Sequence, residues 1–156
     1  MRYFILCFFV IVNLIYAKVE NVEITSKSFM ADELKHISKF IGNVKVVKGY
    51  DTITSKTLIV NFDKNRKPVK YTAIGNAKFK LILNNKHYAG KADKIIYLPF
   101  KKTYNFIGNV FLQEIDSGKK IYGDNVTIDQ ENGKYSVLSN GNKPVKFIFK
   151  IEDKSK

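Results

Sequence analysis

The dipeptide Gly-Asn occurs four times in this chain of 156 residues, and the four copies are evenly spaced. The glycines are Gly42, Gly75, Gly108 and Gly141, each 33 residues after the one before. A fixed period of this length is the signature of a repeated supersecondary unit that buries its apolar face against its neighbours. The sequence therefore predicts one domain built from about four similar units.

Apolar and polar residues alternate around each Gly-Asn pair, as they do in a half-buried β-strand. After the second pair, Ala77, Phe79 and Leu81 fall on one face and lysines fall on the other. The segment before each pair alternates in the same way, and turn-forming stretches such as DKNRKP and DQENGK separate the two segments. The stretch MADELKHISKF is the best helix candidate, but its place in the repeat favours strand, turn and strand.

Small residues recur ahead of each Gly-Asn pair and indicate a corner of the unit. They are Ser26, Ser55, Ala92 and Gly123. By the alternation, the glycine of each pair falls on the apolar face of its strand, where a missing side chain permits a bend, a bulge or a close approach of two backbones. We interpret the Gly-Asn pairs as architecture, and we expect the stacked units to share one continuous apolar interior.

The first 17 residues are typical of a secretory signal peptide. Arg2 supplies the positive start, an apolar run extends from Tyr3 to Ile15, and the small residue Ala17 marks the expected cleavage site. An uncleaved membrane anchor is the alternative. The only cysteine, Cys7, lies in this leader, so we expect no disulfide in the mature chain. The predicted organisation is a leader over 1–17, a β domain over 18–151 and a polar disordered tail over 152–156.

The formal net charge of +13 raises nucleic acid, an anionic membrane or an anionic glycan as partners, or a compositional bias toward lysine. The lysines alternate with apolar residues instead of forming one block, which favours the polar faces of strands. We expect no nucleic-acid partner, because the leader directs export and no nucleic-acid-binding module matches.

Catalytic motifs are missing from the sequence. His36 and His87 are the only histidines, they have no metal-ligand spacing, and no nucleophile elbow, Walker loop or dinucleotide fingerprint is present. We therefore expect a protein that is not an enzyme, with no catalytic residue, no metal site and no cofactor.

The segment Phe106–Tyr135 resembles the OstA-like family of lipopolysaccharide-transport domains, which includes LptA, LptC and the N-terminal domain of LptD. The similar features are a strand carrying Gly-Asn, then Leu112-Gln113, Asp116-Ser117 and Gly123-Asp124, followed by an alternating strand. The resemblance extends over about residues 19–149. It implies an all-β fold, an elongated and twisted β-jelly roll built from about four 33-residue strand-pair repeats and open at both ends.

The resemblance also implies a function. An LptA-like chain would lie in the periplasm, shield the lipid A acyl chains of lipopolysaccharide or lipooligosaccharide, and assemble head-to-tail into a bridge. An LptC-like inner-membrane protein would dock at the N-terminal edge strand, residues 19–25. An LptD-like outer-membrane translocon would dock at the C-terminal edge strand, residues 143–151. The alternatives are an LptC-like membrane-anchored component, or an exported β-repeat scaffold that binds an anionic glycan or a protein.

Lipid shielding needs an apolar lining, because each buried methylene contributes about 0.8 kcal/mol and a twelve-carbon chain roughly 9 kcal/mol. The alternation and the resemblance together predict a lipid-binding set on the inner face. Its members are Val22, Ile24, Val44, Val46, Leu58, Val60, Phe79, Leu81, Ile95, Tyr97, Val110 and Leu112. These residues would also form the closed core of a jelly roll. Lys91, Lys94, Lys101 and Lys102 are candidates for the rim of the groove.

Overall fold

The structure is a computed structural model, and it describes residues 20–153. The predicted leader, the first residues of the β domain and the end of the tail lie outside this range. The described residues form one antiparallel sheet of ten strands and a short 3-10 turn, η1. The elements are β1 (Val22–Thr25), β2 (Ser28–Asp32), β3 (Ile37–Lys48), β4 (Asp51–Phe62), β5 (Pro68–Leu83), β6 (Lys86–Leu98), η1 (Pro99–Lys101), β7 (Thr103–Glu114), β8 (Lys120–Asp129), β9 (Lys134–Leu138) and β10 (Lys146–Ile148).

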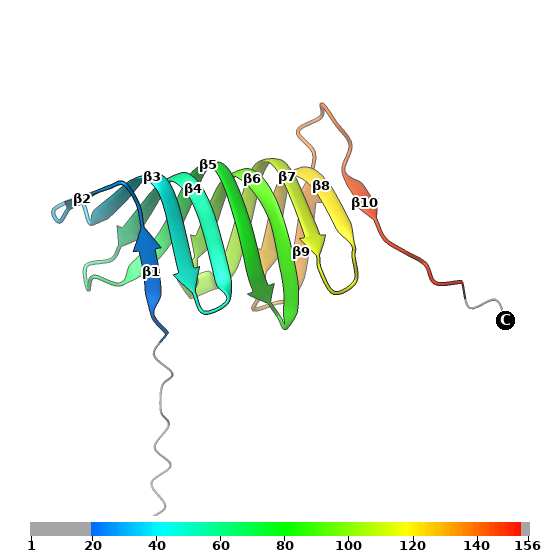
Figure 1. Cartoon of the computed structure of the whole chain (residues 1–156), viewed down its shortest axis with the longest axis horizontal. Helices are drawn as coiled ribbons and strands as arrows, with labels where there is room; N and C mark the ends of the chain where they lie inside the picture. The colour runs from blue at the N-terminus through cyan, green and yellow to red at the C-terminus, as the bar shows by residue number, and fades with distance from the viewer. Residues whose placement is uncertain (1–19, 154–156) are drawn as a thin grey trace, which may run out of the picture.

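The sheet folds over on itself into two layers, which confirms the expected jelly roll (Figure 1). β3 to β8 each run through both layers, and neighbouring strands pair along the whole length of the molecule. One layer ends in β1 and β10, and we call it the β1 layer; the other ends in β2 and β9, and we call it the β2 layer. The layers join where the strands bend, and they are open along the seam between the two rows of turns (Figure 1).

The bend coincides with the Gly-Asn pairs. The register shifts at this point between β3 and β4, between β5 and β6 and between β7 and β8. In the last case Gly108 and Asn109 stand against the single residue Asp124, which is the arrangement of a β-bulge. Both members of this pair have positive φ, +82° and +46°, as do the pairs at 42–43 and 75–76. The left-handed conformation suits glycine and asparagine, which explains the repeated dipeptide.

The small corner residues also lie at the bend. Ser55, Ala92 and Gly123 each pair with the residue that follows a Gly-Asn. Three of the four predicted corners are therefore confirmed in register as well as in position, whereas Ser26 lies in the connection between β1 and β2.

The predicted direction of the glycines was wrong. A Cβ on Gly75 would collide with the exposed side chain of Lys56, and one on Gly108 would collide with that of Asp93. The glycines therefore face the outer surface. Two successive left-handed residues reverse the simple alternation locally, so a period of two assigns their face incorrectly.

The fourth repeat also differs from the expectation. Gly141 has the positive φ of its counterparts, +98°, but it lies in a bend outside any strand. The predicted C-terminal strand over 143–151 shrinks to β10, Lys146–Ile148, whose three residues are all exposed. Among residues 20–153, nothing lies on the outer edge of β10 to hold a longer strand in place. The stretch MADELKHISKF does form strand, turn and strand, as predicted.

The core lies between the two layers. Phe106 is fully buried, and its ring centroid lies 4.5 Å from that of Phe79, which comes from the opposite layer. Seventeen hydrophobic residues have 6% or less of their surface exposed, and within the described range no polar or charged residue is equally buried. The interior is therefore apolar throughout, as the alternation predicted.

Candidate functional site

The open seam gives access to the apolar interior near β1. A cavity of about 130 Å³, the mouth cavity, opens there between the two layers. Val22, Val46 and Leu81 line it from the β1 layer, and Tyr97 and Tyr104 line it from the β2 layer. Lys48 and Asp51 stand at its rim. Both layers therefore contribute to the wall of this cavity.

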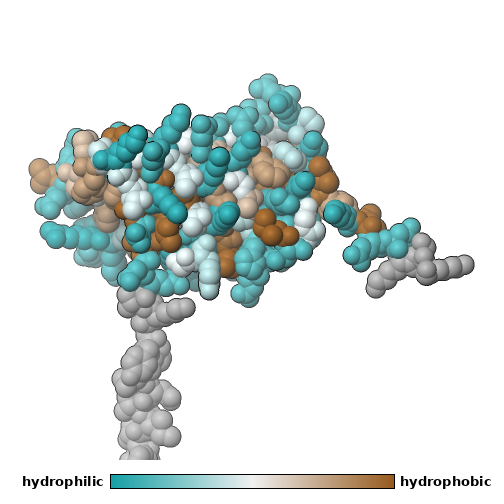
Figure 2. All heavy atoms as spheres, in the orientation of Figure 1, coloured by the Kyte–Doolittle hydropathy of each residue, from teal (hydrophilic) through white to brown (hydrophobic). Residues whose placement is uncertain are grey.

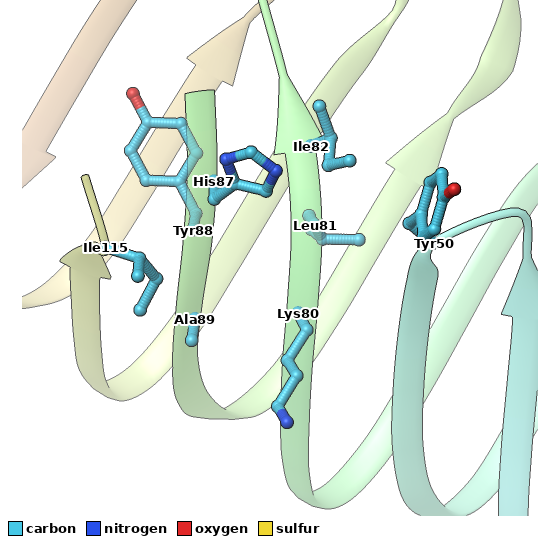
Figure 3. Close-up of a pocket in the computed structure, with 8 residues that line it drawn as sticks. All are labelled: Tyr50, Lys80, Leu81, Ile82, His87, Tyr88, Ala89 and Ile115. Atoms are coloured by element: carbon cyan, nitrogen blue, oxygen red, sulfur yellow. The ribbon is translucent and has the colours of Figure 1, made fainter. Parts of the chain in front are cut away.

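Two further cavities lie beside the hairpins of the β1 layer. The lateral cavity, about 460 Å³, lies at the β5–β6 hairpin between the turns that carry Tyr50 and Ile115 (Figure 3). The C-terminal cavity, about 370 Å³, lies between the layers and is lined by Leu112, Tyr135 and Phe147, among others. All three cavities have mainly apolar walls.

One cross-strand pair contributes to the walls of all three cavities. Leu81 lines both the mouth and the lateral cavity, and Tyr88 lines both the lateral and the C-terminal cavity. Leu81 and Tyr88 are directly paired on β5 and β6, and Figure 3 shows them on neighbouring strands. The lateral cavity lies on the outer side of this pair, because its lining residues Lys80, Ile82 and His87 alternate with the buried Leu81, Leu83 and Tyr88. The mouth cavity and the C-terminal cavity lie on the inner side.

Aromatic rings follow the seam on the β2 layer. Tyr71 and Tyr97 have their centroids 6.1 Å apart, Tyr97 and Tyr104 4.3 Å apart, and Tyr104 and Phe106 5.9 Å apart. Burial raises the pKa of Tyr71, Tyr97 and Tyr104 above the ordinary phenol value, so the three phenols are neutral. The seam thus presents flat, uncharged surfaces to anything that enters it.

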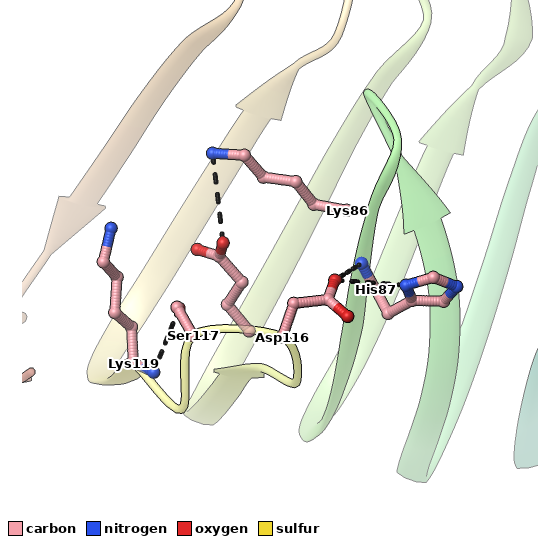
Figure 4. A network of polar contacts seen from close by, with 6 residues as sticks. Lys86, His87, Asp116, Ser117 and Lys119 are labelled. Atoms are coloured by element: carbon pink, nitrogen blue, oxygen red, sulfur yellow. Dashed lines mark hydrogen bonds and ion pairs between the residues drawn. The ribbon is translucent and has the colours of Figure 1, made fainter.

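A polar clamp lies near the far end of the seam (Figure 4). The backbone N–H of His87 donates to Asp116 Oδ2 at 3.1 Å, and the His87 ring lies 3.1 Å from the same oxygen. The N–H of Ile115 donates to the carbonyl oxygen of His87 at 2.8 Å. These bonds hold the β5–β6 hairpin against the turn between β7 and β8, and they lower the pKa of Asp116.

The predicted lipid-binding residues fall into two groups. Eight of the twelve are 3% exposed or less and belong to the packed core: Val44, Leu58, Val60, Phe79, Leu81, Ile95, Val110 and Leu112. The other four, Val22, Ile24, Val46 and Tyr97, are partly open and lie toward β1. The structure brings Val22, Val46, Leu81 and Tyr97 together at the mouth cavity.

The sequence reasoning missed several lining residues. Tyr71 and Tyr104 alternate with the core residues Ala73 and Phe106, so the same pattern could have found them. Tyr88 could not be found this way, because its role depends on the register with Leu81. Of the proposed rim lysines, Lys101 lies in η1 and Lys102 lies between η1 and β7. Lys91 and Lys94 lie at mid-strand on either side of the register shift in β6, away from the seam.

Among residues 20–153, no group of three or more histidine, cysteine, aspartate or glutamate side chains could hold a metal ion. The same range contains no helix with the length and apolar character of a membrane span. What these residues do form is an open, two-layered β-jelly roll with an apolar interior, a class suited to enclosing an apolar ligand.

Comparisons with known proteins place the chain within this class. Residues 23–134 match the family described as LptA/(LptD N-terminal domain) LPS transport protein. The chain belongs to this family, and a general role in lipopolysaccharide transport follows from that membership. No curated protein matches the chain.

A similar solved structure supports the same fold. It is LptH from Pseudomonas aeruginosa, described as the LptA homologous periplasmic component of the conserved lipopolysaccharide transport device. The TM-score is 0.73 with 15% sequence identity, covering 85% of this chain and 96% of LptH. At this identity the likeness confirms the fold.

Proposed function

We propose that this chain is a periplasmic carrier that shields the lipid A acyl chains of lipopolysaccharide in its apolar interior. The observation that carries the proposal is the apolar interior between the two layers, which the mouth cavity and the C-terminal cavity enter beneath an open seam. Family membership supplies the substrate class.

The mouth cavity is the expected entrance. Its volume of about 130 Å³ is small for several acyl chains, so loading must widen the seam. The layers are covalently continuous only at the bend, which leaves the two rows of turns able to separate. Each methylene that enters gains about 0.8 kcal/mol, and this gain offsets the cost of parting the seam.

Assembly into a bridge is the second part of the proposal. β1 and β2 form one end of the sheet and β9 and β10 form the other, and unpaired strand edges invite pairing with another chain. Hydrophobic side chains are exposed at both ends, and Figure 2 shows hydrophobic surface there. They are Phe29, Met30 and Leu34 at the first end, and Phe147, Ile148, Phe149 and Ile151 at the second.

The family resemblance suggests a partner for each of the two ends. An LptC-like inner-membrane protein would pair at the β1 end, further copies would add head-to-tail, and an LptD-like translocon would pair at the β10 end. Such a contact joins two different surfaces and does not close on itself, so it extends into a filament.

Depletion of the protein in its own cells tests the proposal. Newly made lipopolysaccharide should then accumulate at the inner membrane, and a copy supplied on a plasmid should restore its delivery. Normal arrival of new lipopolysaccharide at the cell surface after depletion would refute the carrier role.

A further inference from the structure

The outer face of the β1 layer carries a row of aligned side chains that the apolar interior does not use. Paired residues on successive strands are Lys78 on β5, Lys91 on β6, Phe111 on β7, Tyr122 on β8 and Lys146 on β10. With strands about 4.8 Å apart, five strands extend the row over roughly 19 Å. Two hollows of about 300 and 450 Å³ lie along it and share Lys91 and Asn109.

The row continues beyond Lys78 in the other direction. Lys78 pairs with Thr54 on β4, Thr54 pairs with Lys45 on β3, and Lys45 pairs with Thr25 on β1. Eight aligned positions therefore contain four lysines, two threonines, two aromatic residues and no acid. Figure 2 views this face, where hydrophilic side chains cross the molecule between its two ends.

The charges of the row lack partners. Lys78 and Lys91 are directly opposed, an arrangement that destabilises a sheet when the charges are alike. In the described residues none of the four lysines forms a salt bridge. The two acids that line the hollows are engaged elsewhere: Asp93 accepts a hydrogen bond from the Asn109 amide at 3.0 Å, and Asp124 accepts one from the backbone N–H of Asn140 at 2.9 Å. A sheet that keeps opposed, unpaired lysines is suited to an anion that bridges them.

Besides its positive charges, the row carries a pair of aromatic rings. The centroids of Phe111 and Tyr122 lie 5.0 Å apart, and Lys146 Nζ lies 4.8 Å from the centroid of the Tyr122 ring. Both rings are only half-buried, so apolar surface is exposed between two positive ends. Threonine hydroxyls and the amides of Asn76 and Asn109 add neutral donors and acceptors.

We propose that this row, the outer groove, binds an acidic saccharide, a linear sugar chain that carries carboxylate or phosphate groups. Lysines meet the acidic groups, asparagine and threonine meet the hydroxyls, and the exposed aromatic surface meets the apolar C–H face of a sugar ring. The strand spacing is comparable with the length of one sugar residue, so successive rings can follow successive strands.

The saccharide would belong to a separate glycan, not to the lipid in the interior. The groove lies on the outer side of the sheet beside the bulges at mid-strand, whereas the seam opens between the turns at the strand ends. The inference does not depend on lipid binding. It predicts that loading the interior with lipopolysaccharide leaves saccharide binding unchanged.

Calorimetric titration of the purified protein tests the inference with three probes: hexagalacturonate as the acidic saccharide, maltohexaose as the neutral one and the oligonucleotide dT6. The double variant Lys78→Gln/Lys91→Gln should bind hexagalacturonate roughly tenfold more weakly, since each exposed ion pair contributes up to about 1 kcal/mol. The control Lys64→Gln/Lys70→Gln removes the same charge from exposed sites elsewhere and should change the Kd less than twofold.

Stability provides an independent readout. Because the variant relieves the repulsion between Lys78 and Lys91, its urea midpoint should rise while its saccharide affinity falls. Equal weakening in the two double variants would overturn the inference, because the effect would then be net charge alone. So would maltohexaose or dT6 binding as tightly as hexagalacturonate, or loss of saccharide binding when lipopolysaccharide is loaded.

Discussion

The ring of Tyr104 stacks on that of Tyr97 across β6 and β7, with centroids 4.3 Å apart and planes 19° from parallel. The pair forms the floor of the mouth cavity, where the packed core meets the open seam. Tyr104 is 6% exposed and belongs to the core, whereas Tyr97 is only half-buried. A molecule that enters through the mouth cavity would contact Tyr97 before it reaches the core.

Alkaline pH should destabilise the fold through these tyrosines. Burial raises the pKa of Tyr71, Tyr97 and Tyr104 above 10.0, so above pH 10 the unfolded chain loses protons that the folded chain retains. The stabilisation is fully present below pH 10. Above pH 10, each of these tyrosines lowers the free energy of unfolding by about 1.4 kcal/mol per pH unit.

Urea unfolding at pH 8 and pH 11 measures this effect. Tyr104→Phe keeps the ring and removes the ionising group, so its loss of stability between the two pH values should be smaller than that of the wild type. Tyr50→Phe is the control, because the Tyr50 ring is 87% exposed. An unchanged pH dependence in Tyr104→Phe would contradict the explanation.

Replacing a bulge glycine should destabilise the protein more than replacing a turn glycine. Gly108 has φ +82°, and an added Cβ would lie 2.9 Å from Asp93 Cβ. Gly118 has φ +71°, but no atom lies within 4 Å of its added Cβ. Both alanine variants should lose about 1–2 kcal/mol of unfolding free energy, because alanine disfavours a left-handed conformation. Gly108→Ala should lose about 1 kcal/mol more, because its side chain also collides with Asp93. Thermal or urea unfolding compares the two, and equal losses would show that the bulge tolerates a side chain.

Acid should release the polar clamp of His87 and Asp116. The two bonds from His87 hold the pKa of Asp116 below 3.8, so the stabilisation is present above pH 3.8 and is lost as the pH falls through the lowered value. Hydrogen-exchange protection of the His87 amide should fall over this range. In Asp116→Ala it should already be low at neutral pH. Protection that is the same in both proteins would exclude the carboxylate as the clamp.

The exposed residues that follow β10 should control assembly but not folding. Phe149 and Ile151 are 54% and 81% exposed, so Phe149→Asp/Ile151→Asp should change the free energy of unfolding by less than about 0.5 kcal/mol. The proposed head-to-tail contact should weaken strongly, which sedimentation velocity over a range of concentrations would detect. If the variant and the wild type form oligomers equally, the β10 end is not the docking surface.

The sequence predicted the strands, the corners and the inner face because these depend on local rules. Period-two alternation identifies which side of Phe79 or Val110 is buried, and the 33-residue period aligns the units. Left-handed residues break the alternation, which is why the glycines were assigned to the wrong face. The length of the C-terminal strand over 143–151 was overpredicted, because the length of a strand depends on its neighbours. In the described residues β10 has a partner on one edge only.

The candidate site was less predictable for a related reason. Alternation treats Val46 and Val44 alike, yet Val44 is 1% exposed and Val46 lines an open cavity. The difference arises from position along the strand, because Val44 lies beside the bend and Val46 lies nearer the turn at the open seam, and no local pattern encodes that position. The pairing of Leu81 with Tyr88 in the cavity walls also depends on register.

The structure also changes how lipid binding should be probed. A charge at Phe79 or Val110 would lie in the packed core, since both are 3% exposed or less, and would unfold the protein. Tyr97 is partly open and is therefore the better position for a probe.

The most direct test of the lipid carrier is photo-crosslinking from Tyr97 in cells that make lipopolysaccharide. A benzophenone amino acid at Tyr97 faces the mouth cavity, and the same residue at Ile96, its neighbour, faces the outer surface. The proposal predicts a covalent lipopolysaccharide adduct from Tyr97 and none from Ile96, with both variants folded and exported. No adduct from Tyr97, or equal adducts from both positions, would contradict it.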